Sequence, residues 1–171
     1  MAACNPRPDL NDDGEDVQKF ADFMRFLAPP PRGPVTSDVT AGDSLFTSVG
    51  CAGCHMRTLT TGSNASPALS NKTFHPYSDF LLHDMTDLFT TPGGAGGGDG
   101  IGGQGRATTR ELRTAPLWGL RAVTRFMHGG DAVTLTEAID QHRGQGNDAA
   151  AAFFNSSATQ QRQLLAFLNS L

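Results

Sequence analysis

The chain of 171 residues has little of what most β-sheets are built from, since it contains one Tyr and only two Ile. It has no apolar run of the roughly 20 residues that a membrane-spanning helix needs. Its formal net charge of −4 leaves no excess of Lys and Arg with which to bind nucleic acid. These deficits argue against a sheet protein, a transmembrane segment and a nucleic-acid partner.

Cysteine is also scarce, but two of the three cysteines stand in the stretch Cys51-Ala52-Gly53-Cys54-His55. C-x-x-C-H is the attachment signature of a c-type haem, because two thiols can add to one porphyrin while the next imidazole reaches its iron. No second C-x-x-C exists to complete a closed zinc site, and no strand-like run precedes Cys51, as a thioredoxin-like redox pair would need. One covalent haem c is the leading hypothesis, with zinc and a redox pair as alternatives.

Helical patterns flank this motif on both sides. Apolar residues recur three and four apart within 16–28, and a second apolar face runs from Gly42 to Val49 and leads directly into the motif. Near the C-terminus, Ser157 and Gln160 form a capping box ahead of a leucine stripe. We therefore predict an all-α, cytochrome c-like fold with long irregular loops, in which the helix around Leu45–Val49 packs against that around Leu164–Leu168.

Composition divides the chain into two parts. Residues 1–36 comprise an acidic segment, a helix and a Pro-rich linker, and residues 37–171 form the predicted haem domain. The acidic segment resembles half of an EF-hand loop, but Phe20 stands where the bidentate Glu is required, so a solvated acidic cap is the better interpretation. Nine of the thirteen residues 93–105 are Gly, which predicts a flexible surface loop.

A haem bound by His55 on one face needs a second axial ligand or has an open position, and His142 is the best candidate. Thr134 and Glu137 predict a capped helix whose apolar face ends at this imidazole. A core histidine hydrogen-bonded to a carbonyl would fit the same pattern, so both interpretations stay open here. The other candidates are Met85, Met127, His75, His83 and His128.

Five segments of the chain resemble one known family. They are FADFMRFLAPPP, LFTSVGCAGCH, FHPYSDFLLHDM, RTAPLWGLRAVTRFMHGGDA and TLTEAIDQH. They are similar to the C-terminal haem half of the di-haem oxidoreductases of peroxidase or thiol oxidoreductase type, and more distantly to the bacterial di-haem cytochrome c peroxidases. The resemblance implies that His142 takes the place of a distal axial ligand that is usually Met, giving a bis-histidine haem. It also implies that His128 belongs to a loop near the haem or the domain interface, and that carbonyls around Thr114 and Pro116 help to hold an interdomain calcium ion.

Two functions follow from this pattern. A six-coordinate haem transfers electrons, whereas the family resemblance implies part of a peroxidase-type enzyme whose catalytic haem lies elsewhere, so whether the chain is an enzyme stays open. The expected partner is a redox protein or an N-terminal haem domain. A periplasmic or otherwise exported location is expected because bacteria attach haem covalently outside the cytoplasm, although MAACNPRPDL lacks a secretory apolar region. Arg113, Arg121 and Arg125 are candidate propionate partners, and Trp118 is a candidate for packing on the haem edge.

Overall fold

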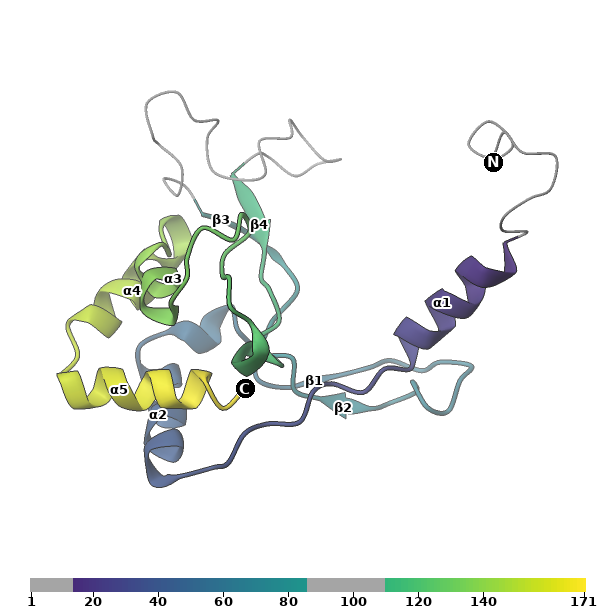
Figure 1. The fold of residues 1–171 in the computed structure, drawn as a ribbon, viewed down its shortest axis with the longest axis horizontal. Helices are drawn as coiled ribbons and strands as arrows, with labels where there is room; N and C mark the ends of the chain where they lie inside the picture. The colour runs from purple at the N-terminus through teal and green to yellow at the C-terminus, as the bar shows by residue number, and fades with distance from the viewer. Residues whose placement is uncertain (1–13, 86–109) are drawn as a thin grey trace.

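The crossing of two helices forms the centre of the molecule (Figure 1). The computed structural model describes residues 14–85 and 110–171. Helix α2 (Ser37–Ser48) packs against helix α5 (Ala158–Leu168) more extensively than any other pair of described elements does. This contact confirms the predicted pairing of the second and last helices. The fully buried large side chains at its centre are Phe46, Phe153, Leu164, Phe167 and Leu171.

The two helices approach most closely at Gly42. A Cβ added there would lie 2.0 Å from the carbonyl oxygen of Gln163 and 2.7 Å from Cβ of Phe167. Any side chain would overlap the backbone of α5, so the crossing requires glycine at this position. The apolar face predicted from Gly42 to Val49 is therefore the surface through which α2 contacts α5.

Side-chain caps fix where the helices begin. Thr36 accepts a hydrogen bond from the Val39 N–H at the start of α2, and Ser157 forms the predicted capping box with Gln160 at the start of α5. The second predicted capping box, between Thr134 and Glu137, begins the short helix α3 (Leu135–Asp140). Helix α4 (Asn147–Phe154) follows, with Phe153 buried against the α2–α5 core.

Helix α1 differs from the others because none of its residues is buried. It spans Glu15–Arg25, close to the predicted 16–28, and lies apart from the rest of the described fold in Figure 1. Its apolar side chains are exposed, with Phe20 at 67% and Phe23 at 61%. The predicted helix is present, but its apolar face contacts no core within the described residues. The division into residues 1–36 and 37–171 stays a prediction.

The all-α prediction is wrong, because two pairs of short antiparallel strands accompany the helices. Strand β1 (Leu59–Thr60) pairs with β2 (Thr73–Phe74), and β3 (Leu82–Asp84) pairs with β4 (Glu111–Arg113), so the fold is mixed α/β. Each strand has two or three residues, too few to show the alternation by which strands are recognised in a sequence. Three single 3₁₀ turns complete the described elements: η2 (Cys51–Gly53), η3 (Leu120–Ala122) and η4 (Gly144–Gly146).

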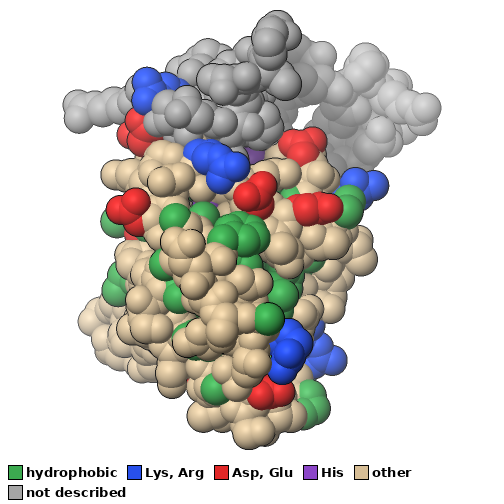
Figure 2. All heavy atoms as spheres, turned by 90° about the vertical axis from the view of Figure 1, so that its left-hand side faces the viewer, with side chains coloured by type: hydrophobic (Ala, Val, Ile, Leu, Met, Phe, Trp, Pro, Cys, Tyr) green, Lys and Arg blue, Asp and Glu red, His purple; other side chains and the backbone are tan. Residues whose placement is uncertain are grey.

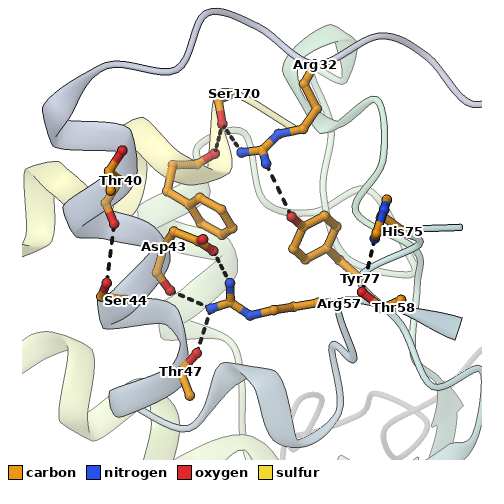
Figure 3. Close-up of polar contacts among 11 residues, drawn as sticks. Arg32, Thr40, Asp43, Ser44, Thr47, Arg57, Thr58, His75, Tyr77 and Ser170 are labelled. Carbon is orange, nitrogen blue, oxygen red and sulfur yellow. Dashed lines mark hydrogen bonds and ion pairs between the residues drawn. The ribbon is translucent and has the colours of Figure 1, made fainter.

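Two arginines tie irregular segments to the α2–α5 core (Figure 3). Arg57, just beyond the C-x-x-C-H motif, pairs with Asp43 and donates to the Thr47 hydroxyl at 2.6 Å, both on α2. Its guanidinium also lies 5.6 Å from the centroid of the Phe46 ring. Arg32, in the linker before α2, donates to Ser170 Oγ at 2.8 Å. Arg57 therefore fixes the segment that follows the motif on the helix that precedes it.

Two features of the described residues concern the molecular surface. No helix among residues 14–85 and 110–171 is long and apolar enough to cross a membrane. Figure 2 shows the face that lies on the left of Figure 1, where acidic and basic side chains are interspersed. The Gly-rich stretch 93–105, Cys4 and the acids before Gly14 lie outside the described residues.

Candidate haem site

The C-x-x-C-H motif folds as one tight turn directly after α2. Gly50 adopts a φ of +99°, a left-handed conformation that favours glycine, and this reverses the chain between α2 and η2. The His55 N–H then donates to the Cys51 carbonyl at 3.0 Å, which closes the turn. Residues three and four apart share one side of such a turn. The thiols of Cys51 and Cys54 and the imidazole of His55 therefore come from a single turn of backbone.

The imidazole of His55 is held by one backbone carbonyl and by the aromatic core. Its Nδ1 lies 2.9 Å from the Tyr77 carbonyl oxygen, and its ring centroid is 6.4 Å from that of Phe46. Burial lowers the pKa of His55 to about 4, although the hydrogen bond to Tyr77 opposes this. The ring is therefore neutral at pH 7, with its proton on Nδ1 facing the carbonyl. The lone pair on Nε2 remains available for a metal ion.

The imidazole of His142 is likewise held by a backbone carbonyl. His142 lies two residues beyond α3, which ends earlier than the sequence predicts, and its backbone N–H continues the turn by donating to the Ile139 carbonyl at 3.1 Å. Its Nδ1 is 2.7 Å from the Ala138 carbonyl oxygen. Burial lowers the pKa of this imidazole as well, so it is neutral at pH 7. The bond to a carbonyl uses Nδ1 and leaves Nε2 free.

The two imidazoles lie at a separation that suits one shared metal ion, with their ring planes at 55° to each other. Their ring centroids are 6.4 Å apart. Two imidazoles that bind one ion from opposite sides, each through a metal–nitrogen bond of about 2.0 Å, have centroids roughly 6 Å apart. Metal-bound histidines almost always donate their second ring N–H to a carbonyl, carboxylate or water, as both do here. The residues present therefore fit a haem iron with two histidine ligands.

The two cysteines are free thiols beside this pair of imidazoles. Burial raises the pKa of the Cys51 thiol to about 11, and burial together with the Asp79 charge raises that of Cys54. Both are therefore protonated at pH 7. Cys54 Sγ lies 3.7 Å from Nδ1 of His83, and these two groups and an Asp79 carboxylate oxygen are all within 4.8 Å of one another. This cluster is a second possible use of Cys54, as a metal ligand.

A polar pair beside Cys54 was not recognised as such in the sequence. His83 Nε2 is 2.8 Å from Asp79 Oδ2, and the two side chains are 19% and 7% exposed. Burial opposes ionisation of Asp79, but hydrogen bonds, led by that from the Leu81 N–H and followed by that from His83, outweigh it and lower its pKa. From the sequence, His83 was a candidate ligand or a residue lining the haem site, and its pairing with Asp79 was not predicted. The spacing of four residues between Asp79 and His83 was the available signal.

The other residues singled out in the sequence lie in different surroundings. Trp118 packs beside Phe74, with ring centroids 6.0 Å apart, and His75 bonds the Thr58 hydroxyl at 3.0 Å. The Thr114 carbonyl accepts a hydrogen bond from Ser78 at 2.8 Å. The calcium site near Thr114 and Pro116 stays a prediction, as do the propionate roles of Arg113, Arg121 and Arg125. Axial ligation by Met85, Met127 or His128 in place of His142 likewise stays an untested alternative.

Comparison with known families shows which class of protein the chain belongs to. The family model described as "Di-haem oxidoreductase, putative peroxidase" matches residues 8–171. The chain belongs to the di-haem oxidoreductase family, which confirms the resemblance seen in its five sequence segments. Haem binding and a redox function follow from this membership.

The chain was also compared with individual curated proteins and with solved structures. No curated protein matches the chain. A solved structure of hydrazine synthase from Kuenenia stuttgartiensis, pressurised with 20 bar xenon, is similar with 20% identity and a TM-score of 0.49. The match covers 85% of this chain and 51% of the other, so the chain spans about half the length of that relative.

Proposed function

We propose that this chain is a c-type cytochrome domain that transfers electrons through one haem. In this proposal Cys51 and Cys54 hold the haem through thioether bonds, and His55 and His142 are the axial ligands. The supporting observation is the pair of neutral imidazoles at 6.4 Å, each with Nδ1 bonded to a backbone carbonyl. Each carbonyl fixes the orientation of its ring and raises the basicity of the nitrogen that faces the iron.

The ligand set decides between electron transfer and ligand chemistry. A haem supplies one-electron redox chemistry, and two imidazoles leave no vacant position for peroxide or oxygen. Imidazole in place of the thioether of Met also favours a lower potential. Phe46 packs against the His55 ring, and the Tyr77 ring packs in turn against Phe46. These residues suit a haem that changes oxidation state without changing its ligands.

The decisive experiment is the replacement His142→Ala in the haem-loaded chain. We expect the parent to have a low-spin ferric spectrum and the variant a high-spin one, with faster binding of carbon monoxide after reduction. His75→Ala is the matched control, because it removes an exposed histidine whose side chain bonds the Thr58 hydroxyl and has no contact with His55 or His142 among those found in the described residues. A low-spin spectrum that survives His142→Ala would reject this ligand assignment.

A larger peroxidase-type oxidoreductase is the second candidate. The family is di-haem, whereas C-x-x-C-H occurs once in this chain. The second haem would then belong to an N-terminal haem domain or to a redox partner protein. Covalent attachment of haem would imply a periplasmic or otherwise exported location. Rapid peroxide turnover by the haem-loaded chain alone would favour an open iron, and so contradict ligation by His142.

Zinc is the alternative to haem, and the cluster of Cys54, Asp79 and His83 gives it a specific place. A thiolate, a carboxylate and an imidazole are all zinc ligands, with a fourth position left for water. Mass spectrometry of the denatured chain separates the two, because a covalent haem stays attached and a zinc ion does not. A chain matured with haem machinery that keeps its unmodified mass and contains zinc would reject the haem proposal.

A further inference from the structure

A continuous run of hydrogen bonds joins the two sides of the haem site. The Asp79 N–H donates to the Cys54 carbonyl at 2.9 Å, next to His55. The Asp79 carboxylate bonds His83 Nε2 at 2.8 Å, and His83 Nδ1 lies 3.1 Å from Oε1 of Gln145. Gln145 stands in η4, three residues beyond His142. The path therefore leads from the proximal motif to the segment that follows the distal imidazole.

We infer that Asp79, His83 and Gln145 are positioning residues that hold His142 opposite His55, an inference that rests on the proposed axial ligation. Neither side chain at 79 or 83 reaches the iron site as a ligand in this proposal. Their role is to fix η4 against β3, and through η4 the backbone around His142. The structure records β3 and η4 as contacting elements.

The three side chains of this bridge, Asp79, His83 and Gln145, bond to one another and to the backbone. Both nitrogens of His83 lie within hydrogen-bond distance of an oxygen atom, Nε2 of Asp79 Oδ2 and Nδ1 of Gln145 Oε1. The carboxylate is fixed in turn, since its Oδ1 accepts from the Leu81 N–H at 2.9 Å. Gln145 Oε1 also accepts from the Asp84 N–H at 3.1 Å, which makes oxygen the atom that faces both donors. Gln145 is exposed, so it is the weakest part of the bridge.

The elements that carry His142 are short. Helix α3 has only six residues, and His142 follows its end. The turn η4 lies directly against the imidazole, since a Cβ on Gly146 would be 3.1 Å from Cβ and 3.2 Å from Cδ2 of His142. A displacement of η4 would therefore reach the ring at once. Loss of the bridge should increase the fraction of time during which His142 is away from the iron.

The test measures how fast carbon monoxide binds to the reduced, haem-loaded full chain. We expect His83→Ala and Gln145→Ala to bind it about tenfold faster than the parent, which corresponds to about 1.4 kcal/mol in favour of the detached state. The ferric spectrum should remain mainly low-spin, because the ligand itself is retained. Gln145→Glu keeps an oxygen acceptor in the same place, so its rate should stay within about twofold of the parent.

Two controls separate the possible failures. His75→Ala removes a histidine whose bond to Thr58 does not join the two sides, and it should leave the rate unchanged. If His142→Ala speeds binding while Gln145→Ala and His83→Ala do not, the bridge is rejected and the axial ligation stands. If His142→Ala changes neither rate nor spectrum, the ligation itself fails. Should His83→Ala not fold, the exposed Gln145→Ala and Gln145→Glu pair decides the outcome alone.

Discussion

Helices α1 and α5 have the same length and comparable apolar stripes, yet their environments are opposite. Both contain eleven residues. Phe167 on α5 is completely buried against Phe46 of α2, whereas Phe20 on α1 is 67% exposed. The period of a stripe predicts a helix with one apolar face, but it does not say what covers that face. In α5 the covering surface is α2, and for α1 no described part of the chain supplies one.

The close contact between α2 and α5 makes the largest prediction, which concerns Gly42. Gly42→Val should prevent the α2–α5 crossing, because the added Cβ alone would overlap the Gln163 carbonyl. We expect the variant to lose at least about 3 kcal/mol of unfolding free energy, more than most single substitutions do, and so to accumulate little folded protein. Urea unfolding followed by circular dichroism measures this loss.

Gly53→Ala is the matched control for Gly42→Val. It lies in the same part of the chain, but nothing is within 4 Å of an added Cβ. Its unfolding free energy should change by no more than about 0.5 kcal/mol. A stable Gly42→Val protein would show that α2 and α5 lie farther apart at Gly42 than in this structure.

Acid should destabilise the fold through protonation of His55, whose ring packs against Phe46 in the core. In the folded chain without haem the pKa of His55 is about 4, below its ordinary 6.5. Between pH 6.5 and 4 the unfolded chain therefore binds a proton on His55 that the folded chain does not bind. The contribution of His55 to the unfolding free energy is fully present above pH 6.5 and is lost as the pH falls toward 4. The loss from this group approaches about 3 kcal/mol, at 1.36 kcal/mol per pKa unit. The lowered pKa of His142 acts in the same direction.

Unfolding of the haem-free chain at several pH values between 7 and 4 checks this prediction. His55→Asn should remove most of the acid sensitivity, whereas the exposed His128→Ala should leave it intact. A stability that stays constant from pH 7 to pH 4.5 would mean that the His55 ring is open to water.

Much of the helical fold and the central motif could be predicted from the sequence, because both depend on local spacing. The capping boxes at Thr134 and Ser157 and the pairing of α2 with α5 were predicted and are confirmed. The strands were missed because their pairing depends on contacts between distant residues. Strand β3, for example, pairs Leu82 with Arg113, across a stretch of sequence without any periodic signal.

The same distinction applies to the candidate site. Cys51, Cys54 and His55 lie within five consecutive residues, so their grouping could be predicted from the sequence. His142 was chosen from a helical pattern and lies opposite His55, and its role as a ligand remains a proposal. Arg57 was overlooked because its partners depend on how the chain turns back over α2. Asp79 and Gln145 escaped notice for the same reason, since their connection passes through His83.

Two arginine–aspartate pairs provide a smaller contrast between the regions. Arg57, 31% exposed, pairs with Asp43 and covers the Phe46 ring, whereas Arg25, 52% exposed, pairs with Asp22 on α1 at 2.6 Å. Arg57→Ala should lose about 1 to 2 kcal/mol of unfolding free energy, mainly through its hydrogen bonds and packing. Arg25→Ala should lose at most about 0.5 kcal/mol, as exposed pairs do. Chemical unfolding of both variants tests this, and equal losses would contradict it.

The smallest expected effect belongs to α1 itself. Phe20→Ser should change the unfolding free energy by less than about 0.5 kcal/mol, because the side chain is exposed in the folded chain. Phe46→Ala, the matched loss of a ring from α2, should cost about 3 to 5 kcal/mol. An exposed apolar face of this kind favours association, so sedimentation of Phe20→Ser should show less concentration-dependent self-association than the parent. A loss above about 1 kcal/mol in a dilute monomer would instead mean that α1 packs against its own chain.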